Sequence, residues 1–266
     1  MFVNILILIT AVLAAEEAPP ASPSPRIIPG QIMLETQEKA YPYKLVQPVP
    51  AEGALPLVVF LHGAGERGDD NAAHMRRPLR LLNAPHMASK PCFMLAMQCP
   101  KGESWAPFRP RGPLPDRPLP AMQALMEAIE TVVAEYPVDP TRIYLTGLSM
   151  GGFGTWELAA RRPSWFAAAV PICGGGRAQI APALVDLPIW AFHGQNDQVV
   201  KEAGSRRIID AIRAAGGRPA YSSLPGVGHN AWDVAYGPRG AMEWLFAQEN
   251  PRPGLTSSPA VKDLSD

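Results

Sequence analysis

Apolar runs of strand length alternate with longer amphipathic segments along the chain. Helical periodicity occurs in residues 119–136 and 202–217, where apolar residues recur every three to four positions. This alternation predicts an α/β fold, with a mostly parallel central sheet and helices on both faces. Five runs are almost wholly apolar, as expected of strands buried on both sides: "LPLVVFLHG" (55–63), "CFMLAMQCP" (92–100), "RIYLTG" (142–147), "FAAAVPIC" (166–173) and "LPIWAFHG" (187–194).

Two further segments precede this pattern. "QIMLET" (31–36) and "YPYKLVQP" (41–48) are interpreted as paired antiparallel strands. No repeat period is visible, and 266 residues are enough for one large domain with a substantial core. We therefore predict a single domain over residues 31–250, preceded by a Pro-rich linker at 16–30 and followed by a flexible tail at 251–266.

The first residues carry an apolar run, from Ile5 to Ala15, before an abrupt polar and Pro-rich stretch. This pattern is typical of a signal peptide, here residues 1–15, and predicts a secreted or periplasmic protein. The run is too short to span a bilayer and no cysteine lies near its small residues, so no membrane anchor is expected. Because no Lys or Arg precedes the run, a buried first strand or helix is the alternative.

The charge balance bears on the choice of partner. The chain has 24 basic and 24 acidic residues, so no net field would draw it to nucleic acid or to an anionic membrane. A small, uncharged or mixed partner is expected instead.

The three cysteines are interpreted as buried small apolar residues, not as a disulfide framework or a metal site. Cys92 and Cys99 bracket one predicted strand, whose rise would hold them about 20 Å apart, far beyond the reach of a disulfide. Cys173 closes another apolar run.

A serine lies at a predicted change from strand to helix. In "TGLSMGGFGTWELAA" (146–160), Ser149 follows an apolar run and precedes a helical pattern. Such a turn needs glycine where Cβ atoms would clash, and Gly147 and Gly151 flank the serine in the way that G-x-S-x-G requires. The motif predicts an exposed nucleophile at the tip of the turn. An ordinary turn with a serine near the helix start is the alternative.

Two more polar residues follow predicted strands. Asp197 comes shortly after the run at 187–194, and "AYSSLPGVGH" (220–229) ends in His229. The carboxyl ends of parallel strands meet at one edge of the sheet, where active groups gather. The chain order of Ser149, Asp197 and His229 is the order found in α/β-hydrolases.

These three residue types can perform nucleophilic catalysis together. A serine hydroxyl is a poor nucleophile at neutral pH, so His229 would take its proton and Asp197 would orient the imidazole. Taken singly, Asp197 could be a turn residue and His229 a loop histidine. The other candidate carboxylates fit less well, because Asp186 precedes its strand and Asp233 is too near His229 in sequence.

Four motifs in order carry a family resemblance: "VVFLHGAGERG" (58–68), "PVDPTRIYLTGLSMGGFGTWELA" (137–159), "HGQNDQVV" (193–200) and "GVGHNAWDVAYG" (226–237). Together they resemble secreted α/β-hydrolase esterases of the dienelactone-hydrolase and prolyl-oligopeptidase-like group. That group includes feruloyl and acetyl esterases of plant cell-wall polysaccharides and polyhydroxybutyrate-depolymerase-like enzymes. The resemblance spans roughly residues 31–250 and implies an α/β-hydrolase fold. The sequence departs from the group at Met97 and Lys201, where proline is common.

Acyl transfer places negative charge on a carbonyl oxygen, which backbone N–H groups should stabilise. Met150 follows the nucleophile and offers the first donor, and Ala64 in the "HGAGERG" loop offers the second. His62 is interpreted as a residue that shapes this loop and not as the base. Glu66 and Arg67 are expected to pair with each other and hold the loop, and a substrate contact is the alternative.

The Pro-rich segment 101–120 is expected to form a rim of the site, because long irregular loops in compact domains are usually functional. Trp105 and Phe108 on this segment, and Trp232 after His229, are the candidate substrate contacts. Aromatic walls suit a phenolic acyl group or a sugar ring, and a core position is the alternative for the tryptophans.

The sequence thus predicts a secreted serine esterase without metal or cofactor. Its expected substrate is a small-molecule or polysaccharide-linked ester, such as an acetyl or feruloyl ester. A serine peptidase with the same triad is the enzymatic alternative. A non-catalytic binding module would lack a complete triad, and all three members are present here.

Overall fold

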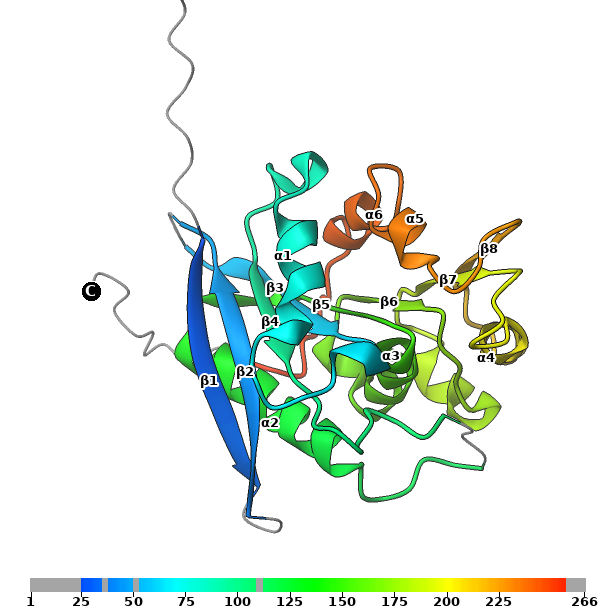
Figure 1. The fold of residues 1–266 in the computed structure, drawn as a ribbon. Coiled ribbons are helices and arrows are strands. Elements are labelled where there is room, and N and C mark those ends of the chain that lie inside the picture. Colours follow the sequence, from blue (N-terminus) through cyan, green and yellow to red (C-terminus); the bar gives the residue numbers. More distant parts are fainter. Residues whose placement is uncertain (1–24, 35–37, 50–52, 109–111, 257–266) are drawn as a thin grey trace, which may run out of the picture.

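The computed structural model describes residues 25–34, 38–49, 53–108 and 112–256. A central sheet crosses the molecule and helices pack on both of its faces (Figure 1), which confirms the predicted α/β class. The sheet consists of eight strands: β1 (Arg26–Leu34), β2 (Lys39–Gln47), β3 (Leu55–Leu61), β4 (Phe93–Met97), β5 (Val138–Leu148), β6 (Ala168–Ile172), β7 (Trp190–Gly194) and β8 (Ala220–Leu224).

Helices connect these strands. The described residues form α1 (Arg76–Leu82), α2 (Pro120–Glu135), α3 (Met150–Arg161), α4 (Ala203–Ala214), α5 (Trp232–Ala235) and α6 (Met242–Phe246). Short 3-10 helices are η2 (Ala64–Glu66), η3 (Ala73–Met75), η4 (Pro85–Met87), η5 (Pro163–Trp165) and η6 (Ala178–Leu184). The two helices predicted from periodicity are α2 and α4. None of the described helices is long and apolar enough to cross a membrane.

The strand order is β1-β2-β4-β3-β5-β6-β7-β8. β1 pairs with β2, and β2 with β4, in antiparallel fashion, whereas every pair from β4 to β8 is parallel. The carboxyl ends of β3, β5, β7 and β8 therefore lie along the same edge of the sheet. Loops that are far apart in sequence meet at this edge.

The apolar strands are explained by burial on both faces. In β3, Leu57, Val59 and Leu61 belong to the core shared with α2, α3 and α4. The alternate residues Val58 and Phe60 belong to the core on the other face, which includes residues of α1, α5 and α6. Because side chains alternate along a strand, a strand covered on both faces must be apolar at every position.

The predicted antiparallel pair at the N-terminal end of the sheet is confirmed, but its boundary was wrong. β1 begins at Arg26, so it includes five residues that were assigned to the Pro-rich linker. Pro29 is one of the prolines that made this stretch resemble a linker. It pairs with Lys44 in an edge strand, where a residue without an N–H group is tolerated. The predicted signal peptide, residues 1–15, lies outside the described residues.

The C-terminal boundary also differs from the prediction. The backbone N–H of Gly254 donates to the oxygen of Ser164 at 2.7 Å, and Leu255 packs against the core. The first residues of the predicted flexible tail are therefore docked on the domain, and residues 257–266 lie outside the described part of the chain.

Cys92, Cys99 and Cys173 are all buried and free, as predicted. β4 and β6, which precede Cys99 and Cys173, are separated by β3 and β5. Burial raises the pKa of each of the three thiols to about 12.

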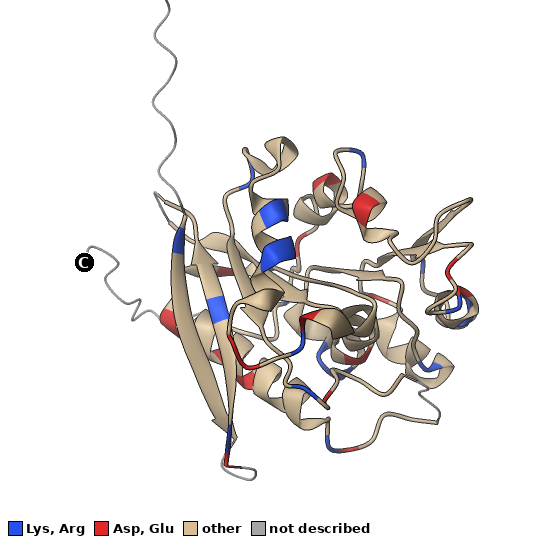
Figure 2. Ribbon diagram, in the orientation of Figure 1, with Lys and Arg blue, Asp and Glu red and all other residues tan. Residues whose placement is uncertain are grey.

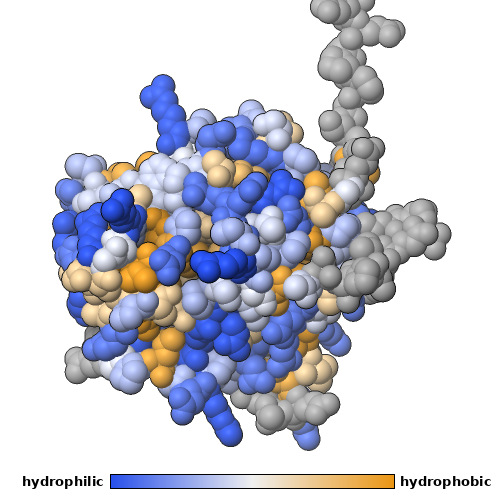
Figure 3. Space-filling model, turned by 180° about the vertical axis from the view of Figure 1, so that it is seen from behind, coloured by the Kyte–Doolittle hydropathy of each residue, from blue (hydrophilic) through white to orange (hydrophobic). Residues whose placement is uncertain are grey.

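Charged and apolar residues are mixed over the molecule. Basic and acidic residues are interspersed, with a short basic run on α1 (Figure 2). Seen from behind, apolar side chains form patches that are separated by hydrophilic ones (Figure 3). Among the described residues, the large apolar side chains that are exposed are Ile27, Met33, Val49, Phe108, Val199 and Val234. Phe108 and Val199 lie beside Ser149, as described below.

Candidate active site

Ser149 occupies a strained turn between β5 and α3. Its φ of 54° and ψ of −118° lie where few residues with a Cβ atom are found. The flanking glycines are required by close packing: a Cβ at Gly147 would lie 2.6 Å from the oxygen of Gly151. A Cβ at Gly151 would lie 2.0 Å from the oxygen of Leu61 in β3. The G-x-S-x-G motif therefore allows the turn to pack directly on β3.

The structure brings Ser149, His229 and Asp197 together as predicted. His229 Nε2 lies 2.9 Å from Ser149 Oγ, and His229 Nδ1 lies 2.7 Å from Asp197 Oδ2. Because an ionised carboxylate only accepts, His229 Nδ1–H donates to Asp197 and the Nε2 lone pair faces the serine hydroxyl. This is the tautomer in which imidazole can take the serine proton.

Hydrogen bonds hold Asp197 in its ionised form. Burial by itself would raise the pKa of this carboxyl group, but hydrogen bonds from His229, Val200 and Val199 outweigh burial and the pKa lies below its usual value. The rejected carboxylates lie elsewhere. Asp186 lies before β7, and Asp233 accepts a hydrogen bond from Asn230 at 3.3 Å.

The two predicted oxyanion donors begin short helical segments beside the nucleophile. Met150 is the first residue of α3 and Ala64 the first of η2, so neither N–H group has an acceptor within its own helix. Ala64 lines the same cavity as Ser149. A Cβ built on Gly63 would lie 3.6 Å from Cβ of Ser149, which shows how closely this loop approaches the nucleophile.

His62 anchors this loop to the neighbouring strand. The N–H of Cys99, just after β4, donates to His62 Nε2 at 2.9 Å, so Nδ1 carries the proton of the neutral ring. Nδ1–H donates to the oxygen of Gly63 at 2.7 Å. His62 is therefore a loop-shaping residue, as predicted, and it does not contact Ser149 through any described hydrogen bond.

The predicted pair of Glu66 and Arg67 is wrong. Glu66 instead accepts from Arg77 Nε of α1 at 3.0 Å. Arg67 donates to the oxygens of Ala64 and Glu103, at 3.0 and 3.1 Å. Both side chains still hold the loop. Glu66 ties it to α1, and Arg67 ties it to Glu103 and bonds within the loop to Ala64.

A cavity of about 600 Å³ opens beside Ser149. Phe108 lines it, as predicted, and packs edge-to-face on Phe153 of α3 with ring centroids 5.6 Å apart. Sequence reasoning missed Phe153, Val199, Lys201 and Arg207, which also line the cavity. Val199 is 71% exposed although it is apolar, so an apolar side chain is open to solvent at this cavity.

The predicted substrate contact at Trp105 is wrong, because this side chain is fully buried. Trp105 Nε1–H donates to the oxygen of His62 at 3.1 Å, and the ring lies against Gly154 of α3. Trp105 is thus a core residue behind the oxyanion loop. Its indole finds a backbone acceptor inside the core, which the sequence pattern does not reveal.

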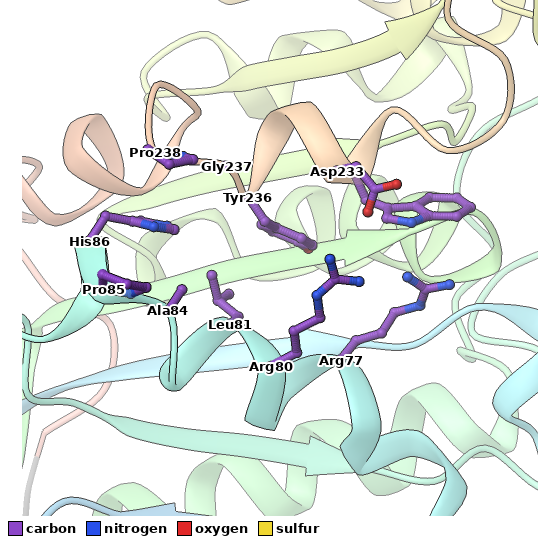
Figure 4. Close-up of a pocket in the computed structure, with 11 residues that line it drawn as sticks. Arg77, Arg80, Leu81, Ala84, Pro85, His86, Asp233, Tyr236, Gly237 and Pro238 are labelled. Atoms are coloured by element: carbon purple, nitrogen blue, oxygen red, sulfur yellow. The ribbon is translucent and has the colours of Figure 1, made fainter.

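Trp232 also lies away from the cavity of Ser149. It lines a second cavity of about 330 Å³, between α1 and α5, together with Arg77 and Arg80 (Figure 4). Its ring packs edge-to-face on His229, with centroids 5.3 Å apart, and the guanidinium carbon of Arg77 lies over the ring, 4.6 Å from its centroid. Trp232 therefore backs the triad imidazole and does not form the predicted wall beside Ser149.

A buried cluster lies next to Asp197. Potential ligand atoms of Cys173, His193 and Asp197 all lie within 4.8 Å of one another. Polar contacts with Asp197 account for this spacing. The Cys173 thiol bonds to the carboxylate, and His193 Nε2 lies 3.2 Å from Asp197 Oδ2. Cys173 is thus a buried residue of the core, as predicted, and it has in addition a polar neighbour in Asp197.

Comparison with known proteins agrees with this geometry. Residues 116–233 match the family described as "Dienelactone hydrolase family". A solved structure of a thermostable esterase is 36% identical in sequence and superposes with a TM-score of 0.77, over 84% of this chain and 63% of that one. The middle of the chain is thus similar to the dienelactone hydrolase family, and the chain as a whole has the fold of a solved α/β-hydrolase esterase. The predicted α/β-hydrolase fold is thereby confirmed.

Two curated relatives match this α/β-hydrolase over shorter stretches. Poly(3-hydroxyalkanoate) depolymerase C of Paucimonas lemoignei is 42% identical over 52 residues, which is 20% of this chain and 13% of the relative. The bifunctional acetylxylan esterase/xylanase XynS20E of Neocallimastix patriciarum is 33% identical over 78 residues, which is 29% of this chain and 12% of the relative. The α/β-hydrolase thus spans only a small part of the length of these relatives.

Three buried histidines make the stability of the α/β-hydrolase depend on pH. Burial lowers the pKa of His62, His74 and His193, and that of His74 falls to about 4. Between about pH 6.5 and the folded-state pKa, the unfolded chain binds protons that the folded chain does not, so stability falls as pH falls. His74 alone should contribute a loss on the order of 3 kcal/mol between pH 6.5 and 4.

Denaturant unfolding between pH 7 and 4.5 measures this loss. Nε2 of His74 bonds to the oxygen of Ala96 at 3.1 Å, and the amide of a His74→Gln variant can replace that bond without titrating. The variant should show a shallower dependence on pH than the wild type. A stability that stays flat over this range, or an unchanged slope in the variant, would contradict the assignment.

Proposed function

We propose that this α/β-hydrolase cleaves carboxylic esters through a covalent acyl-enzyme, with Ser149 as the nucleophile. The observation that carries the proposal is the continuous hydrogen-bonded line from Asp197 through His229 to Ser149, next to an open cavity. The family match and the 36% identity to a thermostable esterase support it.

In the first half of the reaction, His229 Nε2 takes the hydroxyl proton as Ser149 Oγ bonds to the ester carbonyl carbon. The imidazolium then returns this proton to the oxygen of the leaving alcohol when the carbon–oxygen bond breaks. In the second half, water replaces the serine by the same two proton transfers. Asp197 stays ionised throughout and stabilises the imidazolium that forms in each half.

The carbonyl oxygen gains negative charge in the tetrahedral intermediate. The N–H groups of Met150 and Ala64 are the proposed donors, because both begin helical segments on either side of Ser149. The His62 anchor and the buried Trp105 hold the Ala64 loop in place. Preorganised donors of this kind stabilise the transition state without moving during the reaction.

For the substrate, we propose an acetyl or feruloyl ester, either as a small molecule or linked to a plant cell-wall polysaccharide. The edge-to-face pair of Phe108 and Phe153 offers an apolar wall for an acyl group. The relative named as an acetylxylan esterase/xylanase supports the same class. A polysaccharide substrate would be met outside the cytoplasm, in line with the signal-peptide pattern in residues 1–15.

Replacing the nucleophile tests the proposal. Ser149→Ala should lower kcat/KM for p-nitrophenyl acetate by several orders of magnitude, because the acyl-enzyme can no longer form. Its melting temperature should stay close to that of the wild type. The exposed Ser164 provides a matched control, since Ser164→Ala should hydrolyse the ester at the wild-type rate. Full activity of Ser149→Ala would place the nucleophile elsewhere. A peptide amide assayed in parallel distinguishes an esterase from a peptidase.

A second substitution tests the acyl wall. Phe108→Ala should lower kcat/KM for methyl ferulate about tenfold, and that for p-nitrophenyl acetate much less, because only the aromatic acyl group packs on the ring. Ile27→Ala removes an exposed apolar side chain on the edge strand β1 and serves as the control. Equal losses for the two substrates would exclude an aromatic acyl pocket at Phe108.

A further inference from the structure

Asp197 lies between two imidazole rings. Its Oδ1 accepts the backbone N–H groups of Val199 and Val200 at 2.8 and 2.9 Å. Its Oδ2 lies 2.7 Å from His229 Nδ1 and 3.2 Å from His193 Nε2. The second imidazole is fully buried and belongs to β7, so it cannot contact the substrate.

The positions of the protons on His193 follow from its neighbours. Nε2 lies 2.9 Å from the oxygen of Val200 and 3.2 Å from Asp197 Oδ2, and both of these atoms can only accept. Nε2 must therefore carry a proton. This N–H bonds to the oxygen of Val200, and Asp197 Oδ2 is a second acceptor 3.2 Å from the same nitrogen. In the neutral ring, Nδ1 then carries no proton and lies 2.8 Å from Ser205 Oγ, whose single hydroxyl proton is within reach of both Nδ1 and the oxygen of Gly174.

We propose that His193 is a positioning residue of the triad, which donates Nε2–H to Asp197 Oδ2 and keeps the carboxylate aimed at His229. The inference rests on the proposed function, because it assigns a role within the same hydrolytic site. Asp197 then has donors on every side, and rotation about its carboxylate would break at least one hydrogen bond. The role requires Nε2 and not merely a ring of this size.

Two more side chains, those of Ser205 and Cys173, contact His193 and Asp197. Ser205 Oγ lies 2.7 Å from the oxygen of Gly174, so it ties His193 to the loop after β6. Cys173 begins that loop with a φ of 48°, which is unusual for a residue other than glycine, and its thiol bonds to Asp197. The titratable groups around His193 are Asp197, Glu202, His229 and Cys173.

The contribution of His193 should appear in kcat. An imidazolium forms at His229 in each half of the reaction, and a carboxylate that rotates away stabilises it less. Misplacement of a group by about 1 Å can lower turnover by about two orders of magnitude. The loss of the Nε2 donor should thus lower kcat about 10- to 100-fold, with little change in KM.

Two substitutions separate the donor from the packing. The amide of His193→Gln reaches the place of Nε2 and can still donate to Asp197. The amide of His193→Asn reaches only the place of Nδ1, so it can bond to Ser205 but not to the carboxylate. His193→Gln should keep kcat within a few-fold of the wild type, while His193→Asn should show the full loss. Melting temperatures are measured for both.

The pH dependence adds a readout that a packing defect would not move. A carboxylate that is no longer aimed at His229 stabilises the imidazolium less, so this ring loses its proton more easily. In His193→Asn, the acidic limb of the kcat/KM profile should therefore move to lower pH. In His193→Gln it should stay in place.

Proton NMR provides an independent test without substrate. The downfield resonance of His229 Nδ1–H should persist in the wild type and His193→Gln, and should broaden or disappear in His193→Asn. This pattern in a protein that hydrolyses no ester would refute the proposed function and leave the inference standing. A wild-type kcat, acidic limb and resonance in His193→Asn would overturn the inference. Equal losses in both variants with equally lowered melting temperatures would also overturn it, and would leave His193 as a packing residue.

Discussion

The close packing of the Ser149 turn on the end of β3 is the constraint on which the rest of the site depends. A Cβ atom at Gly151 would lie 2.0 Å from the oxygen of Leu61, so the turn and the strand are in direct backbone contact. The same contact brings the loop after Leu61 against the nucleophile, because Ala64 follows that strand by only three residues. Nucleophile and oxyanion loop are thus positioned by one contact between neighbouring strands of the sheet.

The other two residues of the triad, Asp197 and His229, are positioned by hydrogen bonds and not by backbone packing. Asp197 and His229 follow β7 and β8, which lie further along the same edge of the sheet. Their loops are longer than the Ser149 turn, and a network of N–H donors on Asp197 compensates for this freedom. A rigid nucleophile therefore faces a base whose orientation depends on buried polar groups. Satisfied networks of this kind specify one arrangement, because any rearrangement leaves a buried group unpaired.

Sequence reasoning located the strands, the main helices and the residues of the triad, because each has a local signal. Continuous apolar runs mark the buried strands, and the glycines around Ser149 mark the turn. Asp197 and His229 were found because they follow strands that end at the same edge. These features depend on neighbours in sequence or on the parallel order of the sheet.

The errors concern contacts that only the folded chain defines. Trp105 and Phe108 lie three residues apart on one irregular segment, yet the first is in the core and the second lines the cavity. Glu66 pairs with Arg77 because α1 returns over the loop, a path that the sequence does not indicate. The contact of the buried Cys173 with Asp197 was not foreseen, because the two residues are distant in sequence.

The central claim is that Ser149 is the activated nucleophile of an esterase. Peptide mass spectrometry of the protein after treatment with a fluorophosphonate tests this most directly, because the reagent bonds to a serine only where a base removes its proton. We expect one phosphonyl group per chain, on the peptide that contains Ser149 and on no other. A protein that remains unmodified, or a phosphonyl group on a different residue, would contradict the account.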